Sequence, residues 1–305
     1  MIKPMLAEKL DKAHVSDWHD WVAEQKYDGH RRIVAVDAAE GSVKAYSRPR
    51  KARDGRMLGE PLPPHVVAAF LYLVVYGFGL SYAILDGEDL AGDTATDVRR
   101  KDLVSERRFV VFDVLQLGST SQMSEPNHVR RAALERAFAK AKKLDAKALQ
   151  LAVRWPLASQ QDVLRLARTI WKAGGEGLIL KHVMSLYHAG QRRADWVKIK
   201  KLEHFVLTVV GFEATRGTVM KRGPFAIVRL HDDDGNETTC KTKDDFELER
   251  FEHEYKKSKY GQDHPLYIEG APHPTIGRKL VIECGGRTRD GGYKGPVIWD
   301  RWENE

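Results

Sequence analysis

Twenty consecutive residues, from Val66 to Leu85, carry no charged side chain, and length alone would make this stretch a candidate membrane span. Two glycines, Gly77 and Gly79, interrupt it, and the acidic sequence 86–89 follows with no basic anchor at the expected membrane surface. These interruptions favour a buried helix, a glycine turn and a buried strand over a membrane span. The stretch therefore predicts the core of a globular domain.

The first two thirds of the chain combine predicted strands with helices of unequal length. Strands are expected at 21–26, 33–36, 43–47, 82–85, 109–115, 178–181 and 196–200, and helices at 125–147 and 159–173. The second helix should begin at Ser159, which has an acidic residue downstream as in a helix cap. The strand at 82–85 is expected to deliver Asp86 and Glu88 at its end. Such irregular spacing favours an α+β fold over a regular parallel sheet.

From His204 onward the pattern changes to short strands separated by turn residues. Strands are expected at 205–212, 225–230, 237–241 and 279–284, with one charged helix at 244–257. About five strands and one helix match a small all-β barrel of the OB-fold type, which often binds nucleic acids. The sequence thus predicts an α+β domain at 1–203 and an OB-fold domain at 204–305.

The net charge of +7 and the sequence pI of about 9.2 are compatible with a polyanionic partner. Residues 1–203 hold 34 Lys and Arg against 25 Asp and Glu, whereas the remainder holds 16 against 18, so the first domain should carry the basic surface. Cys240 and Cys284 are too few for a four-thiolate zinc site, and a reducing compartment is expected. The N-terminus contains no signal-peptide stretch, which predicts a cytoplasmic protein without a membrane partner.

The stretch Glu24-Gln25-Lys26-Tyr27-Asp28-Gly29-His30-Arg31 offers an amine, a carboxylate and a guanidinium within a few residues. A lysine amine attacks phosphorus only when unprotonated, so a nucleophilic Lys26 would need burial or neighbouring cations that depress its pKa. Arg31 could supply such a cation and also hold a phosphate in a fork. Taken alone, the string is more typical of a strand that runs into an Asp-Gly turn.

Further motifs reverse this interpretation because they follow in a fixed order. They are Ser47-Arg48, Leu85-Asp86-Gly87-Glu88, Phe112-Asp113, the string 176–181 (Glu-Gly-Leu-Ile-Leu-Lys) and Lys198-Ile199-Lys200. With the Lys26 motif they resemble the covalent nucleotidyltransferase superfamily, and most closely the ATP-dependent DNA ligases in a minimal two-domain form. The opening Pro4-Met5-Leu6-Ala7 and the string Tyr187-x-x-Gly190-x-Arg192 also look like that family's. The resemblance is strong over 1–203 and loose over the remainder.

The resemblance implies a monomeric enzyme that seals nicks in duplex DNA during replication, repair or recombination. Lys26 would attack the α-phosphate of ATP to form a lysyl-AMP, AMP would pass to the 5′-phosphate of the nick, and the 3′-hydroxyl would displace it. These steps need positive charge at the phosphates, hence Mg²⁺, for which Mn²⁺ could substitute. The implied catalytic residues are Lys26, Asp28, Lys198 and Lys200, the nucleotide-binding residues are Glu24, Arg31, Arg48, Glu88, Phe112, Lys181 and Arg192, and the metal ligands are Glu176 and Glu88.

Two of these implied roles concern the adenine ring, and one concerns the metal. Glu24 would lie beside the adenine and Phe112 would stack on it, although a lone phenylalanine is more often a core residue. Glu176 is the preferred metal ligand because hard carboxylate oxygens suit Mg²⁺. Arg193, adjacent to Arg192, remains an alternative for the nucleotide-binding role.

The second domain departs from the family's pattern, in which a basic motif near the C-terminus orients the pyrophosphate. Residues 293–301 look like a degraded form of that motif, with Lys294 where an arginine is expected and Arg301 as the alternative. Basic, glycine-containing loops could contact the DNA backbone, although solvated hairpin tips are equally compatible. The candidate DNA-binding residues are Arg216, Lys221, Arg222, Arg287 and Lys294. The OB-fold domain is expected to swing about a hinge near 201–204.

Other functions share parts of this pattern. An mRNA capping guanylyltransferase uses the same lysine chemistry with GTP, and an RNA ligase uses it on RNA, but the opening 4–7 and the string 176–181 look more like DNA ligases. The lack of a four-cysteine zinc site argues against an NAD-dependent ligase. A non-catalytic, OB-containing nucleic-acid binder would not require an intact set of acidic and basic motif residues.

Overall fold

The computed structural model describes residues 2–10, 13, 15–47, 61–92, 95, 97–213, 227–241, 277–288, 291–293 and 297–303. The chain forms two compact units, Met1–Lys200 and Lys201–Glu305. Among the described residues, no helix is long and apolar enough to cross a membrane.

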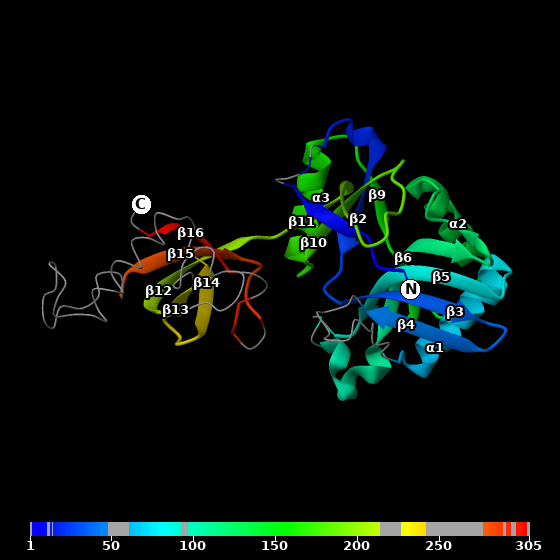
Figure 1. Ribbon diagram of the computed structural model, residues 1–305, viewed down its shortest axis with the longest axis horizontal. Helices are drawn as coiled ribbons and strands as arrows, with labels where there is room; N and C mark the ends of the chain where they lie inside the picture. The colour runs from blue at the N-terminus through cyan, green and yellow to red at the C-terminus, as the bar shows by residue number, and fades with distance from the viewer. Residues whose placement is uncertain are drawn as a thin grey trace, which may run out of the picture. The chain divides into compact units, whose positions relative to one another are not determined.

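The first unit contains two β-sheets, and most of their strands are labelled in Figure 1. Sheet I has the order β1 (Leu6–Lys9), β11 (Arg192–Lys200), β10 (Gly177–His182), β2 (Trp21–Lys26) and β9 (Arg154–Pro156). Sheet II has the order β4 (Ser42–Ser47), β3 (His30–Asp37), β5 (Tyr82–Leu90), β6 (Arg108–Leu117) and β7 (Thr120–Ser121), and β8 (Leu149–Leu151) also pairs with β6. Most neighbouring strands are antiparallel, and only β1 with β11 and β6 with β8 are parallel among the pairs within these two sheets.

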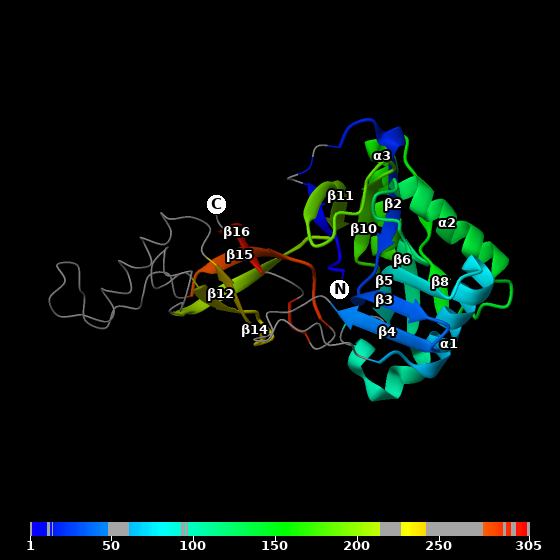
Figure 2. The same cartoon turned by 45° about the vertical axis from the view of Figure 1, so that its right-hand side comes forward.

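One face of each sheet is covered by helices. On sheet I, α3 (Gln160–Lys172) packs through Val163, Ala167 and Ile170, and Figure 2 shows it alongside the strands. On sheet II, the cover consists of α1 (Pro64–Tyr72), the π-helical turn η3 (Leu73–Phe78) and α2 (Asn127–Lys140). Short 3-10 turns lie at η2 (Trp18–Asp20), η4 (Asp97–Arg99) and η5 (Lys101–Glu106). Because side chains alternate along a strand, the opposite faces of both sheets remain available to line a site.

The uncharged stretch 66–85 forms the predicted helix, glycine turn and strand. α1 continues into η3, which ends just before Gly79, whose φ of +71° is easily adopted by glycine, and β5 follows. The strand was predicted to stop at Leu85, which is wrong, because β5 continues to Leu90. Its continuation is held between β3 and β6, so that Glu88 lies inside the sheet rather than at a strand end.

The predicted helix at 125–147 is also too long. α2 ends at Lys140, because the chain must turn back so that Leu149 can pair with Phe109 in the β8–β6 ladder. The helix cap predicted at Ser159 is confirmed, since its side chain accepts a hydrogen bond of 3.3 Å from the backbone nitrogen of Asp162.

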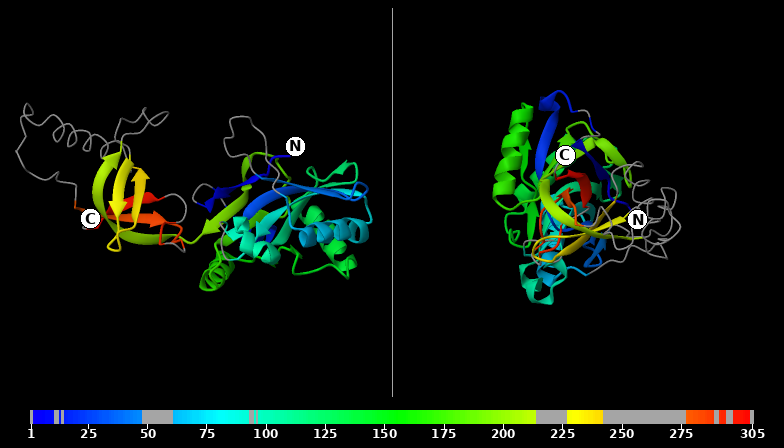
Figure 3. Two further views of the ribbon diagram at one scale, coloured as in Figure 1. Left: turned by 90° about the horizontal axis from the view of Figure 1, so that it is seen from below. Right: turned by 90° about the vertical axis from the view of Figure 1, so that its left-hand side faces the viewer.

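The described strands of the second unit form a closed barrel, shown in Figure 3. The order is β12 (Glu203–Glu213), β13 (Ile227–His231), β14 (Glu237–Lys241), β16 (Ile298–Trp302) and β15 (Lys279–Cys284). Its core contains both cysteines together with Trp299 and Trp302. β16 was not predicted from the sequence, and the predicted helix at 244–257 lies outside the described residues.

Candidate active site

The Lys26 motif carries the chain from one sheet to the other. β2 ends at Lys26 in sheet I, and β3 begins at His30 in sheet II. The crossing passes so close to β5 that a Cβ at Gly29 would lie 2.5 Å from the carbonyl oxygen of Asp89. Only glycine fits there, so the glycine of the Lys26 motif is required by the close packing of this bend against β5.

A cavity of about 300 Å³ opens beside this crossing. It is lined mainly by the uncovered faces of both sheets, with sheet I supplying most of the wall and sheet II supplying Arg31, Glu88 and Phe112. The predicted site residues that line it are Glu24, Lys26, Arg31, Glu88, Phe112, Lys181, Arg192, Lys198 and Lys200. Asp28, in the bend after β2, does not line the cavity. Arg48, Arg216, Lys221, Arg222 and Lys294 lie outside the described residues.

Strand register explains why the sheet I residues meet. Lys26 of β2 pairs with Gly177 of β10, which pairs with Lys200 of β11. Residues paired across neighbouring strands project from the same face, so the two lysines flank the glycine on the cavity side. A Cβ at Gly177 would lie only 2.0 Å from the carbonyl oxygen of Ile199, and its φ of +145° also requires glycine.

Glu176, directly before β10, connects these two lysines. Its Oε2 lies 2.5 Å from Nζ of Lys26, and its Oε1 lies 2.5 Å from Nζ of Lys200. Burial acts to raise the pKa of Glu176, but the charges of Lys26 and Lys200 outweigh burial and lower the pKa. Glu176 therefore stays ionised at neutral pH and holds the amine of Lys26 in a defined place.

Glu88 faces the same region from sheet II, directly opposite Arg31 in the β3–β5 ladder. Burial raises the pKa of Glu88 to about 8, against the opposing effects of Lys26 and Arg31. The charge of Glu176 also raises this pKa, so the two carboxyl groups are close enough to interact. Two carboxyl groups of opposite pKa shift thus flank one lysine.

Arg31 is anchored in sheet II by a pair of hydrogen bonds. Its Nε and Nη2 donate to the carboxylate of Asp86 at 3.0 Å and 2.6 Å, and its Nη1 donates to the carbonyl oxygen of Met5 at 2.6 Å. The hydroxyl of Tyr187 also donates to Asp86, at 2.7 Å, and accepts from the backbone nitrogen of Met5 at 3.0 Å. The opening 4–7 and the Tyr187 string therefore meet at Arg31, which no local pattern indicated.

At another part of the cavity wall, Glu24 is paired with two cations. Its Oε2 lies 2.6 Å from Nζ of Lys181, and its Oε1 lies 2.6 Å from Nη2 of Arg154. Burial would raise the pKa of Glu24, but these cations lower it. Arg154 was missed by the sequence analysis, because nothing near it in the chain signals a partner 130 residues away.

Lys181 is buried between two aromatic rings of the cavity. Its Nζ lies 4.7 Å from the ring centroid of Phe112 and 4.3 Å from that of Trp196. Burial lowers its pKa, although Glu24 and Asp113 act in the opposite direction. The buried Nε1 of Trp196 has no hydrogen-bond partner in the described part of the chain, so a polar group of a ligand could accept from it.

The carboxyl groups fit a hard divalent cation that is shared with a substrate. The described residues contain no cluster of three or more His, Cys, Asp and Glu that could hold a metal ion on its own. Mg²⁺ commonly takes one or two protein carboxylates and completes its shell with water and phosphate oxygens. Glu88 and Glu176, interacting beside Lys26, meet that requirement.

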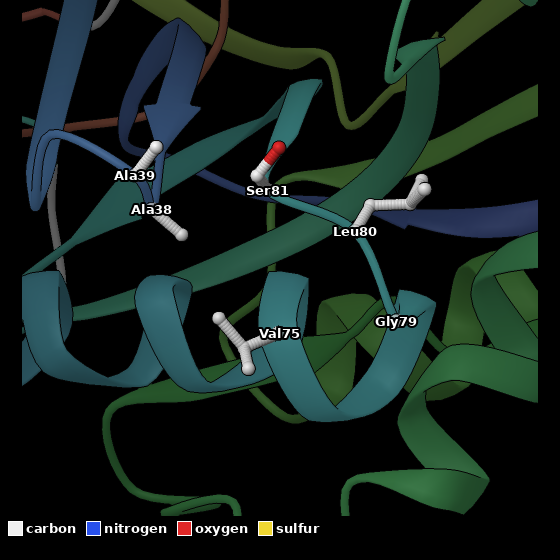
Figure 4. Close-up of a pocket in the computed structure, with 6 residues that line it drawn as sticks. All are labelled: Ala38, Ala39, Val75, Gly79, Leu80 and Ser81. Atoms are coloured by element: carbon white, nitrogen blue, oxygen red, sulfur yellow. The ribbon is translucent and has the colours of Figure 1, made fainter.

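Two other places in the described structure offer fewer groups that could bind or react with a ligand. A hollow of about 540 Å³ lies between η3 and the turn after β3, and Figure 4 shows the residues that line it: Ala38, Ala39, Val75, Gly79, Leu80 and Ser81. None of these side chains titrates. In the second unit, Arg287 lies 2.5 Å from Asp232 and 4.7 Å from the ring centroid of Tyr293, so it braces a loop, and a DNA contact by Arg287 stays a prediction.

Comparison with known proteins gives one consistent family. Residues 4–200 match the family described as "ATP dependent DNA ligase domain". A "Probable DNA ligase" of Pseudarthrobacter chlorophenolicus is 31% identical over 201 residues, which cover 62% of this chain and 35% of that protein. "DNA ligase 2" of Korarchaeum cryptofilum is 27% identical over 299 residues, which cover 88% of this chain and 48% of that protein. The chain spans between 34% and 41% of the length of the first three curated relatives.

Solved structures share the fold. The structure described as "DNA binding with a minimal scaffold: Structure-function analysis of Lig E DNA ligases" aligns with a TM-score of 0.66 at 16% identity, covering 99% of this chain and 100% of that chain. The ligase domain of M. tuberculosis LigD aligns with a TM-score of 0.54 at 20% identity, covering 99% of this chain and 95% of that chain. At these identities the likeness concerns the fold alone.

Proposed function

This chain belongs to the ATP-dependent DNA ligase family, and we propose that it joins a 5′-phosphate to a 3′-hydroxyl at nicks in duplex DNA with ATP as the energy source. The observation that carries the proposal is the pairing of Lys26 with Glu176 at 2.5 Å beside a cavity lined by further cations and an aromatic ring. In this assignment residues 1–203 form the adenylation domain and 204–305 form the OB-fold domain, and the protein acts as a cytoplasmic monomer.

The first step is a transfer of AMP to Lys26. After its ammonium has lost a proton to solvent, Nζ attacks the α-phosphorus of ATP, an N–P bond forms, and the bond to the bridging oxygen breaks with its electron pair leaving on pyrophosphate. The pairing with Glu176 supports this step because it fixes Nζ before attack, which removes much of the entropy of orientation. Lys198 and Lys200 supply positive charge next to the reacting phosphate.

The adenine is assigned to the part of the cavity that contains Phe112 and Glu24. Phe112 would stack on the ring, and Glu24, which Lys181 and Arg154 hold in place, would border it. The unpartnered Nε1 of Trp196 supports a polar contact with the nucleotide in the same region. Arg31, Arg48, Glu88 and Arg192 are assigned to the ribose and phosphates.

Glu88 and Glu176 would hold a divalent cation, Mg²⁺ or Mn²⁺. When bound, the cation would neutralise phosphate charge and polarise the α-phosphate. Glu176 would also keep its role of positioning the amine of Lys26. Asp28 remains assigned to catalysis from its place in the motif.

The remaining steps use DNA. AMP passes from Lys26 to the 5′-phosphate of the nick, and the 3′-hydroxyl then displaces AMP to close the strand. The excess of basic residues in 1–203 supports contact with the phosphate backbone there. Arg216, Lys221, Arg222, Arg287 and Lys294 are the candidates for backbone contact in the second domain.

Label transfer tests this function directly. The purified protein is incubated with a divalent cation and α-labelled ATP or GTP in parallel, after a pyrophosphate wash that removes any bound AMP, and is run on a denaturing gel. We expect a covalent adduct from ATP alone, its absence in Lys26→Ala, and its discharge by nicked DNA with sealing of the nick. An adduct from GTP instead would indicate a capping enzyme, discharge by nicked RNA alone would indicate an RNA ligase, and no adduct would indicate a non-catalytic binder.

A further inference from the structure

Four cations lie along β1 and β11 on one side of the cavity: Arg192, Lys198 and Lys200 line it, and Lys9 pairs with Lys198. Three of them were assigned to the site from sequence motifs, whereas Lys9 belongs to none of those assignments. Lys9 is the last residue of β1, and its side chain is exposed. Its position therefore needs a separate explanation.

Strand register places Lys9 on the cavity side of sheet I. β1 runs parallel to β11, and after an irregularity between Ala7 and Glu8 the partner of Lys9 is Lys198. Paired residues on neighbouring strands project from the same face, and Lys198 lines the cavity. The row of paired residues continues from Lys198 of β11 to Ile179 of β10 and Glu24 of β2. Lys9 therefore lies at the edge of the same wall.

Among the described residues, this wall gathers more cations than carboxylates. Burial lowers the pKa of Lys198, and the charges of Arg192, Lys200 and Lys9 lower it further, while Glu8 alone opposes them among the main contributors. The ionised carboxylate of Glu176 is already shared by Lys26 and Lys200. Like charges gathered in this way repel one another, and an anionic ligand would relieve the repulsion.

We propose that Lys9 is a phosphate-binding residue of this site, which contacts the terminal phosphates of ATP and stabilises pyrophosphate as it leaves. The inference rests on the proposed function, because it deepens the adenylation step. A flexible four-carbon stem at a strand end suits a group that must follow a departing anion. The bond between the α-phosphorus and the bridging oxygen breaks with its electron pair on pyrophosphate, and Lys9 meets the negative charge that develops there.

The phosphate recognised by Lys9 could also come from the DNA backbone, which has the same chemistry. Two assays separate these sources. The first measures pyrophosphate-dependent release of AMP from the pre-adenylated protein, together with KM for ATP in adenylation. The second measures sealing of nicked DNA by the pre-adenylated protein without added ATP, which involves no terminal phosphates.

The test compares Lys9→Gln with Lys9→Arg and with Lys44→Gln, an exposed lysine of β4 in sheet II. We expect Lys9→Gln to raise both KM for ATP and the half-maximal pyrophosphate concentration about tenfold, as loss of one charged hydrogen bond predicts. Lys9→Arg should stay within about twofold of wild type because it keeps the charge, and Lys44→Gln should be unchanged. Sealing by pre-adenylated Lys9→Gln should match wild type.

Two results would overturn the proposal. Unchanged ATP and pyrophosphate dependence would remove Lys9 from the site, and a defect confined to nicked DNA would assign Lys9 to the DNA backbone. Calorimetric binding of inorganic pyrophosphate to the wild type and to Lys9→Gln requires no turnover. A wild type that binds pyrophosphate through Lys9 but forms no adduct would refute the proposed function and leave the phosphate site standing.

Discussion

The Nζ atom of Lys26 lies 2.5 Å from Oε2 of Glu176, although 150 residues separate them in the chain. The second oxygen of Glu176 lies 2.5 Å from Nζ of Lys200. One carboxylate therefore pairs with two lysines that would otherwise repel each other. The amine of Lys26 is therefore placed by a contact with a residue distant in the chain rather than by its own motif alone.

Replacing Glu176 with glutamine should impair adenylation more than nucleotide binding. Without the carboxylate, Lys26 and Lys200 lose their shared partner, and we expect the rate of adduct formation to fall by about 100-fold. Single-turnover label transfer over a range of ATP concentrations separates the rate from the affinity. Glu40→Gln, in the exposed turn after β3, is the matched control, and an adduct rate for Glu176→Gln equal to that of the control would contradict the prediction.

Replacing Arg154 with methionine should destabilise the fold and weaken ATP binding. Glu24 is 3% exposed and would keep only Lys181 as a partner, so breaking the pair should cost about 3 kcal/mol of unfolding free energy. Urea unfolding measures this change. The double variant Glu24→Gln/Arg154→Met should lose less than the sum of the single variants, because no uncompensated carboxylate is left. Strict additivity would show that the pair is not coupled.

Glu88 should give the protein a pH-dependent stability. Its folded pKa of about 8 lies above the ordinary glutamate value of 4.5, so the folded state binds the extra proton between these values. Its contribution is fully present below about pH 4.5 and is lost as the pH rises toward 8. Glu88→Gln mimics the protonated form, and its stability relative to wild type should increase over that range in urea unfolding. A constant difference between the two proteins would rule out a raised pKa.

Replacing Gly177 with alanine should disturb both folding and the site. The added Cβ would meet the carbonyl oxygen of Ile199 at 2.0 Å, and moving β11 away would displace Lys200. Gly41→Ala is the control, since its φ is also positive, at +62°, but nothing lies within 4 Å of the added Cβ. We expect a loss of about 1 kcal/mol for the control and of about 3 kcal/mol or more for Gly177→Ala, measured by urea unfolding. Equal losses would mean that β11 adjusts freely.

The predictable parts of this structure are those that local sequence determines. The helix, glycine turn and strand of 66–85 follow from an apolar run with two glycines, and the cap at Ser159 follows from an acidic residue three positions later. The cavity residues were found because each belongs to a recognisable motif, whether it lies inside a strand, as Glu88 and Phe112 do, or at its end, as Lys26 and Lys200 do. Their roles in catalysis remain predictions, to be tested by the variants above.

The parts that could not be predicted depend on distant partners. In the sequence, Arg154 looks like any arginine of a short strand. Its partner, the buried carboxylate of Glu24, is determined by the β2–β9 register. The network of Arg31, Asp86 and Tyr187 joins β3, β5 and the loop between β10 and β11, which no sequence spacing connects. The extension of β5 to Leu90 likewise reflects pairing on both edges, which overrides the turn tendency of Asp-Gly.

The crossing from β2 to β3 also has a mechanical consequence. Three residues, Tyr27, Asp28 and Gly29, join the two walls of the cavity, and such a link spans about 10 Å at most. Because this link is short, the end of β2 at Lys26 stays close to the start of β3 at His30 however the rest of the two sheets moves. A nucleotide whose reactive phosphate lay beside Lys26 would therefore sit where the chain itself holds the two sheets together.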